Sequence, residues 1–252
     1  MNKIIAFTPA DKANEKYFKM MEASLRKFHT EEELPLLLIG EDKIKQYNDP
    51  MFFYRSTPII AKELFEQGYE TIIKIDADSL IVGSLSEVLQ SDDYDVGVVN
   101  NSNPREFKKF PYIHRNVHQF SYANNGFVVM KNKLFVDLWE TWCTKGIFFK
   151  GDQMREQGGL NDMIHGFQGY FKVKRFDEGD SYYGLAGMGY YPYCELVNNE
   201  IILRKGDRDW PPEGDKKIKI VHFAGGTDNP MKMNYRILFN EEIVKYIDDL
   251  FI

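Results

Sequence analysis

One stretch of this sequence constrains the fold more than any other. It is an apolar run over residues 71–82, rich in β-branched side chains, in which two carboxylates, Asp76 and Asp78, stand two positions apart. A run of this length and composition predicts a buried central strand. The carboxylates then lie at the carboxyl end of that strand, where open α/β sheets bind their ligands. We therefore expect chemistry at this edge of the sheet.

The spacing of Asp76 and Asp78 suits a single hard cation. With only the small Ala77 between them, both carboxylates can reach one divalent metal ion that also holds a diphosphate. The alternative is that the pair arose by chance, because an Asp-x-Asp sequence is short and aspartates after a strand can simply cap a turn. The position after a buried strand favours the metal site.

The segments around the central run predict an α/β fold with a mostly parallel central sheet flanked by helices. A strand over 3–8, a helix over 14–28, a strand over 34–40 and a helix over 56–67 precede it, and this βαβαβ order implies right-handed parallel crossovers. Further strands are expected over 95–99, 121–130 and 217–221. Further helices are expected over 86–89 and 134–142, and after the sequence 156–162.

Length and charge narrow the class of protein. The 252 residues, 43% of them hydrophobic, are expected to form a single domain with a sizeable core. A formal charge of -6 argues against nucleic acid as a partner. Two cysteines fit a reducing compartment. Without a signal-peptide core or an apolar span of about 18 residues, the chain is expected to be soluble and cytoplasmic.

Two common phosphate-binding signatures are missing from the sequence. No G-x-G-x-x-G follows the first expected strand, and no Walker lysine motif occurs. Neither a dinucleotide-binding turn nor a P-loop can therefore hold phosphates here. A metal ion at Asp76 and Asp78 would have to do so.

Three features later in the sequence are further candidates for metal or ligand binding. His222 ends the strand over 217–221 and precedes Gly225, so it is a possible third metal ligand, although a lone histidine is more often structural. Asn124-Asn125-Gly126 could bind sugar hydroxyls or form an ordinary turn. The carboxylate of Glu156 could interact with a ligand or with the dipole of the following helix.

Two other regions have open roles. The basic stretch over 101–119 is either a solvated loop or a lid over the site. A group of tyrosines in the C-terminal third could line an acceptor cleft or pack in the core. They are Tyr182, Tyr183, Tyr190, Tyr191 and Tyr193.

Taken together, four motifs resemble the glycogenin-like retaining glycosyltransferases of the GT-A fold. They are Asp76-Ala77-Asp78, Asn124-Asn125-Gly126, Glu156-Gln157-Gly158-Gly159-Leu160-Asn161 and His222-Phe223-Ala224-Gly225. Their order and spacing match from residue 4 to about residue 232. The resemblance implies a GT-A fold, with a nucleotide-binding half over 1–100 and an acceptor and catalytic half, including a smaller C-terminal β region, over 101–252.

The resemblance also implies roles for individual residues. Asp76, Asp78 and His222 would bind Mn²⁺ or Mg²⁺. Asn124, Glu156 and Gln157 would face the donor sugar and the reacting carbon. The nucleotide and its phosphates would contact Thr8, Ala10, Tyr17, Lys62, Asp76, Ala77, Gly225 and Lys232.

Two positions depart from the family pattern. Glu156 stands where the family has an aspartate, and its side chain is one methylene longer. Asn229-Pro230-Met231 stands where the family has a lysine before proline and tryptophan, so the phosphate-binding lysine would be Lys232 or another base such as Lys109.

The function predicted from the sequence is metal-dependent transfer of a sugar from a nucleotide diphosphate, a UDP-sugar, to a hydroxyl of a carbohydrate acceptor, with retention of anomeric configuration. The alternatives are an inverting GT-A enzyme, a nucleotidyltransferase and a non-catalytic carbohydrate-binding protein. A nucleotidyltransferase would be expected to carry a glycine-rich basic first loop, which Thr8-Pro9-Ala10-Asp11 is not.

Overall fold

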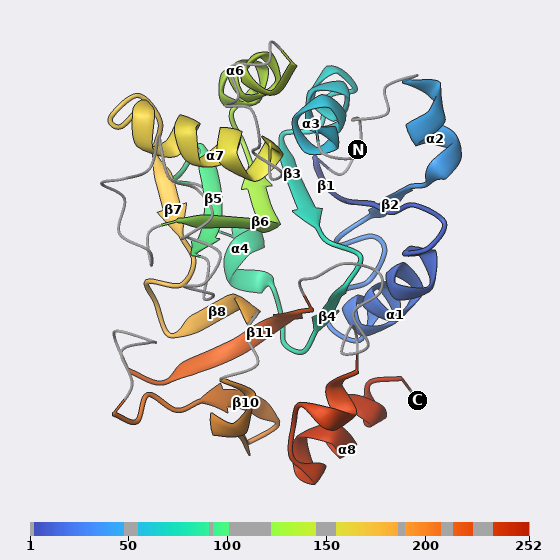
Figure 1. The fold of residues 1–252 in the computed structure, drawn as a ribbon, viewed down its shortest axis with the longest axis vertical. Helices are drawn as coiled ribbons and strands as arrows, with labels where there is room; N and C mark the ends of the chain where they lie inside the picture. The colour runs from blue at the N-terminus through green and yellow to red at the C-terminus, as the bar shows by residue number, and fades with distance from the viewer. Residues whose placement is uncertain are drawn as a thin grey trace.

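The computed structural model describes residues 3–47, 55–90, 93–100, 122–144, 155–185, 190–207, 214–223 and 234–251. Within these ranges the chain forms two β-sheets with helices packed around them (Figure 1). The larger sheet has the strand order β2-β1-β3-β6-β5-β7. The smaller sheet has the order β4-β11-β10-β9, and β8 also pairs with β11.

The larger sheet is mostly parallel, as the sequence predicts. In the part of the sheet that is described, β6 runs against the other five strands, because it is antiparallel to both β3 and β5 while the remaining pairs are parallel. The strands are β1 (Ile4–Pro9), β2 (Leu36–Ile39), β3 (Thr71–Ile75), β5 (Val96–Asn100), β6 (Ala123–Met130) and β7 (Val173–Arg175).

Alternation along β3 divides the core into two layers. Ile72 faces a cluster formed with α3 (Ser56–Glu66), α6 (Lys133–Thr144) and α7 (Arg155–Gly166), which lie together in Figure 1. Ile73 and Ile75 face the opposite cluster, which includes α1 (Glu15–Arg26), α4 (Ser86–Gln90) and residues of the smaller sheet. Successive side chains of a strand point to opposite faces, so residue 74 is on the side of α3 and α7. The short helix α2 (Glu41–Gln46) follows β2.

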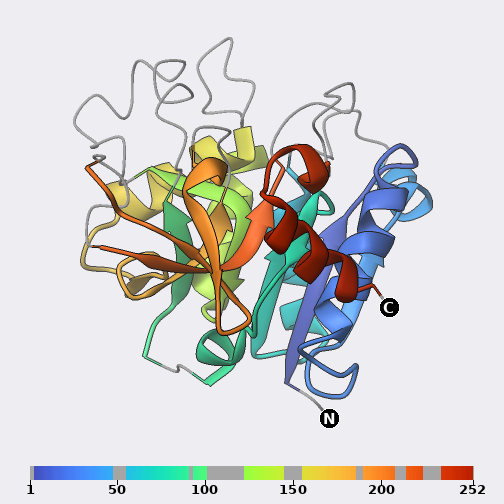
Figure 2. The ribbon, with the colours of Figure 1, turned by 90° about the horizontal axis from the view of Figure 1, so that it is seen from below.

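The smaller sheet contains β4 (Ser79–Ile81), β8 (Ser181–Leu185), β9 (Cys194–Val197), β10 (Glu200–Leu203) and β11 (Lys216–His222). The helix α8 (Glu241–Asp249) packs its buried Ile243 and Ile247 into the same cluster as this sheet, and Figure 2 shows α8 beside it in red. Two 3₁₀ turns, Tyr191–Tyr193 and Tyr235–Ile237, complete the described elements.

The run over 71–82 is divided between the two sheets. The chain leaves the larger sheet after Ile75 and enters the smaller one at Ser79. The backbone N–H of Asp76 donates to Gly126 on β6 (2.9 Å), and the carbonyl of Asp78 accepts from Phe223 after β11 (2.8 Å). Asp76-Ala77-Asp78 therefore forms the connection between the sheets, which places its carboxylates at their junction.

The other expected strands and helices are present, with ends that differ by a few residues. The helix expected after 156–162 instead begins at Arg155 and contains Gly158 and Gly159. A Cβ at position 159 would lie 3.0 Å from Cys143 Sγ and 3.3 Å from the Trp139 ring. The absence of a side chain there lets α6 and α7 approach each other closely, so Gly159 serves helix packing.

Three of the C-terminal tyrosines are packing residues. Tyr182, Tyr183 and Tyr191 are buried, and Tyr183 stacks on Phe127 with ring centroids 5.5 Å apart. Tyr193 is exposed. The structure therefore favours packing over an acceptor cleft for the buried three.

Both cysteines, Cys143 and Cys194, are buried free thiols. Across the described ranges, no helix combines the length and the apolar character needed to cross a membrane. The cytoplasmic location and the single-domain organisation expected from the sequence stay predictions. The basic stretch over 101–119 lies outside the described residues.

Candidate metal centre

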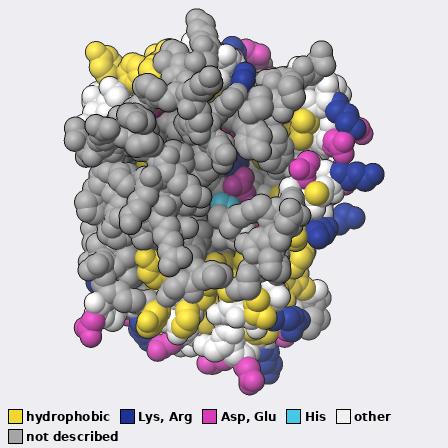
Figure 3. All heavy atoms as spheres, in the orientation of Figure 1, with side chains coloured by type: hydrophobic (Ala, Val, Ile, Leu, Met, Phe, Trp, Pro, Cys, Tyr) yellow, Lys and Arg dark blue, Asp and Glu magenta, His cyan; other side chains and the backbone are white. Residues whose placement is uncertain are grey.

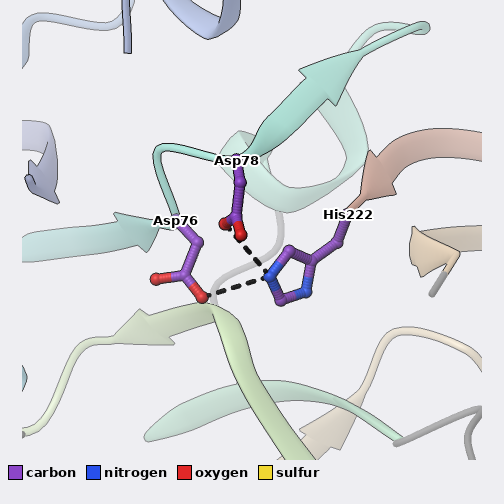
Figure 4. A group of neighbouring side chains, drawn as sticks. All are labelled: Asp76, Asp78 and His222. Carbon is purple, nitrogen blue, oxygen red and sulfur yellow. Dashed lines mark ion pairs between the residues drawn. The ribbon is translucent and has the colours of Figure 1, made fainter. Parts of the chain in front are cut away.

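Three predicted ligands from different parts of the chain converge at the junction of the two sheets. Asp76 follows β3, Asp78 precedes β4 and His222 ends β11 (Figure 4). The antiparallel register of β4 and β11 pairs His222 with Ser79, and this brings the imidazole beside Asp78. Pairing between strands about 140 positions apart thus assembles the group.

The side chains point toward one another. His222 Nε2 lies 3.3 Å from Asp76 Oδ2 and 3.4 Å from Asp78 Oδ1, and one ligand atom from each of the three residues lies within 4.8 Å of the others. The side chain of His222 is 7% exposed, that of Asp78 13% and that of Asp76 30%. Figure 3 shows acidic and histidine atoms together near the centre of the face in view.

Electrostatics hold this cluster in a charged form when no metal ion is bound. Burial lowers the pKa of His222, but the charge of Asp78 and hydrogen bonds to both aspartates outweigh it and raise the pKa to about 10. Burial likewise opposes ionisation of Asp76, yet Lys74 and His222 hold its pKa below the usual value. In the free protein an imidazolium therefore stands between two carboxylates.

The donor set fits a divalent cation. Two carboxylates and an imidazole nitrogen are ligands that Mn²⁺ and similar ions accept, and the imidazole must be neutral to ligate. A cation that replaces the proton between the carboxylates would meet three donor atoms already close together. Three protein ligands leave coordination positions open for phosphate oxygens, as a site that binds a metal–diphosphate complex requires.

Gly126 on β6 makes room for the His222 ring. A Cβ at position 126 would lie 2.4 Å from both Cε1 and Nδ1 of His222 and 2.8 Å from Asn124 Oδ1. Such distances are far below van der Waals contact, so only glycine leaves the imidazole in place. Gly126 of the Asn-Asn-Gly motif thus contributes to the candidate metal centre because it has no side chain that would displace the His222 ring.

Lys74 places a buried positive charge against Asp76, next to the cluster of Asp76, Asp78 and His222. Its side chain is 3% exposed, and Nζ lies 2.5 Å from Asp76 Oδ1. The same ammonium donates to the backbone carbonyl of Asn125. Lys74 therefore contacts the oxygen of Asp76 that faces away from His222.

Glu156, in the first turn of α7, is buried and does not belong to the Asp76, Asp78 and His222 cluster. Its Oε2 accepts from the backbone N–H of Thr57 (2.9 Å), and its Oε1 accepts from the Thr57 hydroxyl and the Asn125 amide. Burial raises the pKa of Glu156, while Lys74, Thr57 and Asn125 lower it in part. The indole of Trp139 fixes the backbone by donating to the Glu156 carbonyl (3.1 Å).

Gln157 and Asn124 are held differently. Gln157 Oε1 accepts from the backbone N–H of Asn125 (3.1 Å), and its buried Nε2 has no hydrogen-bond partner among the described residues. Asn124 Oδ1 accepts from the N–H of Gly126 (2.6 Å). The amide that contacts Glu156 is therefore that of Asn125, the neighbour of the predicted Asn124.

The predicted nucleotide contacts that the structure describes lie on or directly after β1, on α1, on α3 and on the connection between the sheets. Thr8 and Ala10 are fully buried, and the Thr8 hydroxyl has no hydrogen-bond partner in the described ranges. Tyr17 is 9% exposed and belongs to the cluster under the smaller sheet. Lys62 lies 3.6 Å from Glu140 on α6. The nucleotide-binding roles of these four residues stay predictions, as does that of Ala77, which is buried. Gly225 and Lys232 lie outside the described residues.

Comparison with known proteins adds information at the level of structure. No protein-family model matches the sequence, and no curated protein matches it by sequence. The galactosyltransferase LgtC, in complex with donor and acceptor sugar analogs, is 15% identical, with 98% of this chain and 95% of that chain covered and a TM-score of 0.54. Mouse xyloside xylosyltransferase 1 is 10% identical, with coverage of 90% and 99% and a TM-score of 0.56.

A glycosyltransferase involved in the glycosylation of the major capsid of PBCV-1 is also similar, at 9% identity, coverage of 92% and 97% and a TM-score of 0.57. Near-complete coverage in both directions decides the fold. This chain has the GT-A fold. Identities this low establish no more than the fold, so the glycogenin-like relationship and retention of configuration stay predictions.

Within this GT-A fold, sequence reasoning missed Thr57 and Lys74, and it named Asn125 only as part of the Asn-Asn-Gly motif. Thr57 and Asn125 bind Glu156, and Lys74 binds Asp76. A signal for Lys74 was present, because a lysine within an otherwise apolar buried strand needs a charged partner. Nothing near Thr57 in the sequence indicates a partner 99 positions away.

Proposed function

We propose that this chain is a metal-dependent glycosyltransferase that moves a sugar from a nucleoside diphosphate to an acceptor hydroxyl. The observation that carries the proposal is the convergence of Asp76, Asp78 and His222 at the junction of the two sheets. A site that can hold a cation, on a fold that its structural neighbours use for glycosyl transfer, supports this activity over simple carbohydrate binding.

In this proposal the three residues hold a cation, Mn²⁺ or Mg²⁺, against the donor diphosphate. A bound divalent ion would neutralise the negative charge that develops on the departing diphosphate. Asp76 and Asp78 approach from the connection between the sheets and His222 from β11. Because the three side chains are already oriented toward one point, little reorganisation is needed when the donor binds.

Glu156 and Gln157 would act on the sugar. Both oxygens of the Glu156 carboxylate accept hydrogen bonds from Thr57 or Asn125, which fixes the carboxylate. A fixed carboxylate is better suited to stabilising positive charge on the sugar ring than to removing a proton as a base. The buried Gln157 Nε2, without a partner among the described residues, is a suitable donor to a sugar hydroxyl.

The donor we propose is a UDP-sugar, the acceptor is a glycan, and the configuration at the anomeric carbon is retained. These points rest on the motifs that resemble the glycogenin-like enzymes. An NMR spectrum of the product formed from a UDP-α-sugar tests retention, because retention gives an α-linkage. A β-linked product would replace this mechanism with inversion and leave the fold and the metal centre unaffected.

A thermal-shift screen tests the proposed activity. Nucleotide sugars are added with Mn²⁺ or with EDTA, since a ligand that binds the native state raises its apparent stability. We expect at least one UDP-sugar to raise the melting temperature only when Mn²⁺ is present, and the same sugar to be hydrolysed slowly without acceptor. A nucleotide sugar that binds equally well in EDTA and is never hydrolysed would indicate a carbohydrate-binding protein without transferase activity.

A further inference from the structure

Lys74 occupies an unusual position for a lysine. It stands between Ile73 and Ile75 in β3, a strand whose five residues are all buried. A buried ammonium is costly unless it is paired and hydrogen-bonded. Lys74 meets this condition through Asp76 Oδ1, 2.5 Å away, and the carbonyl of Asn125.

This ion pair divides the oxygens of Asp76 between two partners. Oδ1 faces Lys74, and Oδ2 faces His222 Nε2 at 3.3 Å. When His222 is neutral, as a metal ligand must be, the two aspartates and Lys74 leave one net negative charge. The same carboxylates without Lys74 would present two negative charges to a divalent cation.

We propose that Lys74 sets the affinity of the centre, so that a divalent cation binds weakly alone and tightly only together with a diphosphate. The proposal rests on the proposed function, because it concerns the same centre. The ammonium repels a cation that approaches Asp76, and the negative charge of a diphosphate supplies the attraction that Lys74 cancels. Lys74 is a positioning residue, since it acts through Asp76.

The same contact orients the carboxylate. By holding Oδ1, Lys74 limits Asp76 to offering Oδ2 toward His222 and Asp78. Lys74 also holds the backbone of Asn125, whose side chain binds Glu156. Lys74 therefore lies between the candidate metal centre and the residues that hold Glu156.

The test measures Mn²⁺ affinity directly, by the loss of the electron paramagnetic resonance signal of free Mn²⁺, with and without UDP. In the wild-type protein we expect UDP to raise Mn²⁺ affinity at least tenfold, which is about 1.4 kcal/mol of coupling. Lys74→Met removes the charge and keeps the shape of the side chain, and we expect it to raise Mn²⁺ affinity without UDP about tenfold. Lys74→Arg keeps the charge and should stay within about threefold of wild type.

Lys216→Met is the matched control. Lys216 is as buried as Lys74, at 2% exposure, but its ammonium donates to the carbonyls of Asp177 and Gly179. Any general loss from removing a buried lysine should appear in this variant, with Mn²⁺ affinity unchanged.

Equal or weaker Mn²⁺ binding by Lys74→Met would overturn the inference and leave the proposed function standing. If Lys74→Met does not fold, the wild-type comparison decides, because equal Mn²⁺ affinity with and without UDP would also overturn it. If wild type binds no Mn²⁺ even with UDP, the proposed function itself fails.

Discussion

The carboxylates of the candidate site fall into two groups, Asp76 with Asp78 and Glu156 alone, and the environments of these groups are opposite. Asp76 and Asp78 are partly exposed, and they face each other across His222 at the junction of the sheets. Glu156 is buried, and each of its oxygens accepts hydrogen bonds from Thr57 or Asn125. Asp76 and Asp78 come from an Asp-Ala-Asp sequence, whereas Glu156 is followed by Gln157 and two glycines.

This difference shows that the chemical role of a carboxylate depends more on its bonding partners than on its sequence motif. Carboxylates that converge repel each other unless a positive charge lies between them, so Asp76 and Asp78 are arranged for a cation. A carboxylate whose oxygens are already hydrogen-bonded is held in place. The first group is therefore suited to binding a metal ion, and the second to presenting fixed charge to a substrate.

Replacing Asp78 with alanine should have the largest effect on this comparison. Asp78→Ala deletes a proposed metal ligand from the connection between the sheets, so we expect Mn²⁺-dependent UDP binding to weaken at least about 100-fold with little change in melting temperature. The thermal shift produced by UDP and Mn²⁺ measures this. Asp137→Ala, which removes an exposed partner of Lys133 on α6, is the control. A normal shift in Asp78→Ala would mean that the cluster is structural.

Replacing Glu156 with glutamine should separate chemistry from binding. Glu156→Gln removes the fixed charge but keeps the size of the side chain. We expect turnover to fall by about 10²–10⁴-fold, as for a positioned acid–base or electrostatic group, with donor affinity nearly unchanged. Steady-state rates together with donor titrations check this. An equal loss in both would place Glu156 among the binding residues and remove the contrast with Asp78.

Gly126→Ala tests whether the space that β6 leaves for the His222 ring is needed for metal binding. The new Cβ would lie 2.4 Å from the His222 ring, so the imidazole must move, and we expect Mn²⁺ affinity in the presence of UDP to fall about tenfold. Gly166→Ala is the control, because a Cβ there meets nothing within 4 Å among the described residues. Unchanged affinity in Gly126→Ala would show that His222 is not needed as a ligand.

Asp177, outside both groups, tests the effect of burial on a carboxylate for which burial outweighs the nearby charge of Arg175. Burial raises its pKa to about 6. Its ionisation therefore costs nothing below about pH 4, and the cost grows as the pH rises to 6 and is complete above that. Asp177→Asn keeps an oxygen for the N–H of Asn100 and should raise the free energy of unfolding by about 1–2 kcal/mol at pH 7. Urea denaturation at pH 4 and pH 7 measures this, and an equal gain at both values would contradict it.

The sequence was sufficient to predict that Asp76, Asp78 and His222 lie together. Asp76 and Asp78 follow a buried strand and His222 ends another, and the carboxyl ends of strands in α/β folds point toward the ligand site. The parallel arrangement of β1, β2 and β3 was also predictable, because these strands alternate with helices along the chain. These features depend on periodicity and on local order along the chain.

The rest depends on contacts that local sequence does not record. The run over 71–82 changes sheets because Ser79 pairs with His222 on β11. The pairing of β5 with β6 is irregular, since Val98 pairs with Val128 and Val99 with Asn124. Strand alternation cannot be extended through such an irregularity, which is why the neighbour of Asn124 reaches Glu156.

We propose that Asp76, Asp78 and His222 hold a divalent cation that binds a nucleoside diphosphate. Calorimetric titration of UDP into the wild-type protein, once with Mn²⁺ and once with EDTA, tests it most directly. We expect saturable binding with Mn²⁺ and at least about 100-fold weaker binding in EDTA. UDP affinity that is the same in both solutions, or no binding in either, would contradict it.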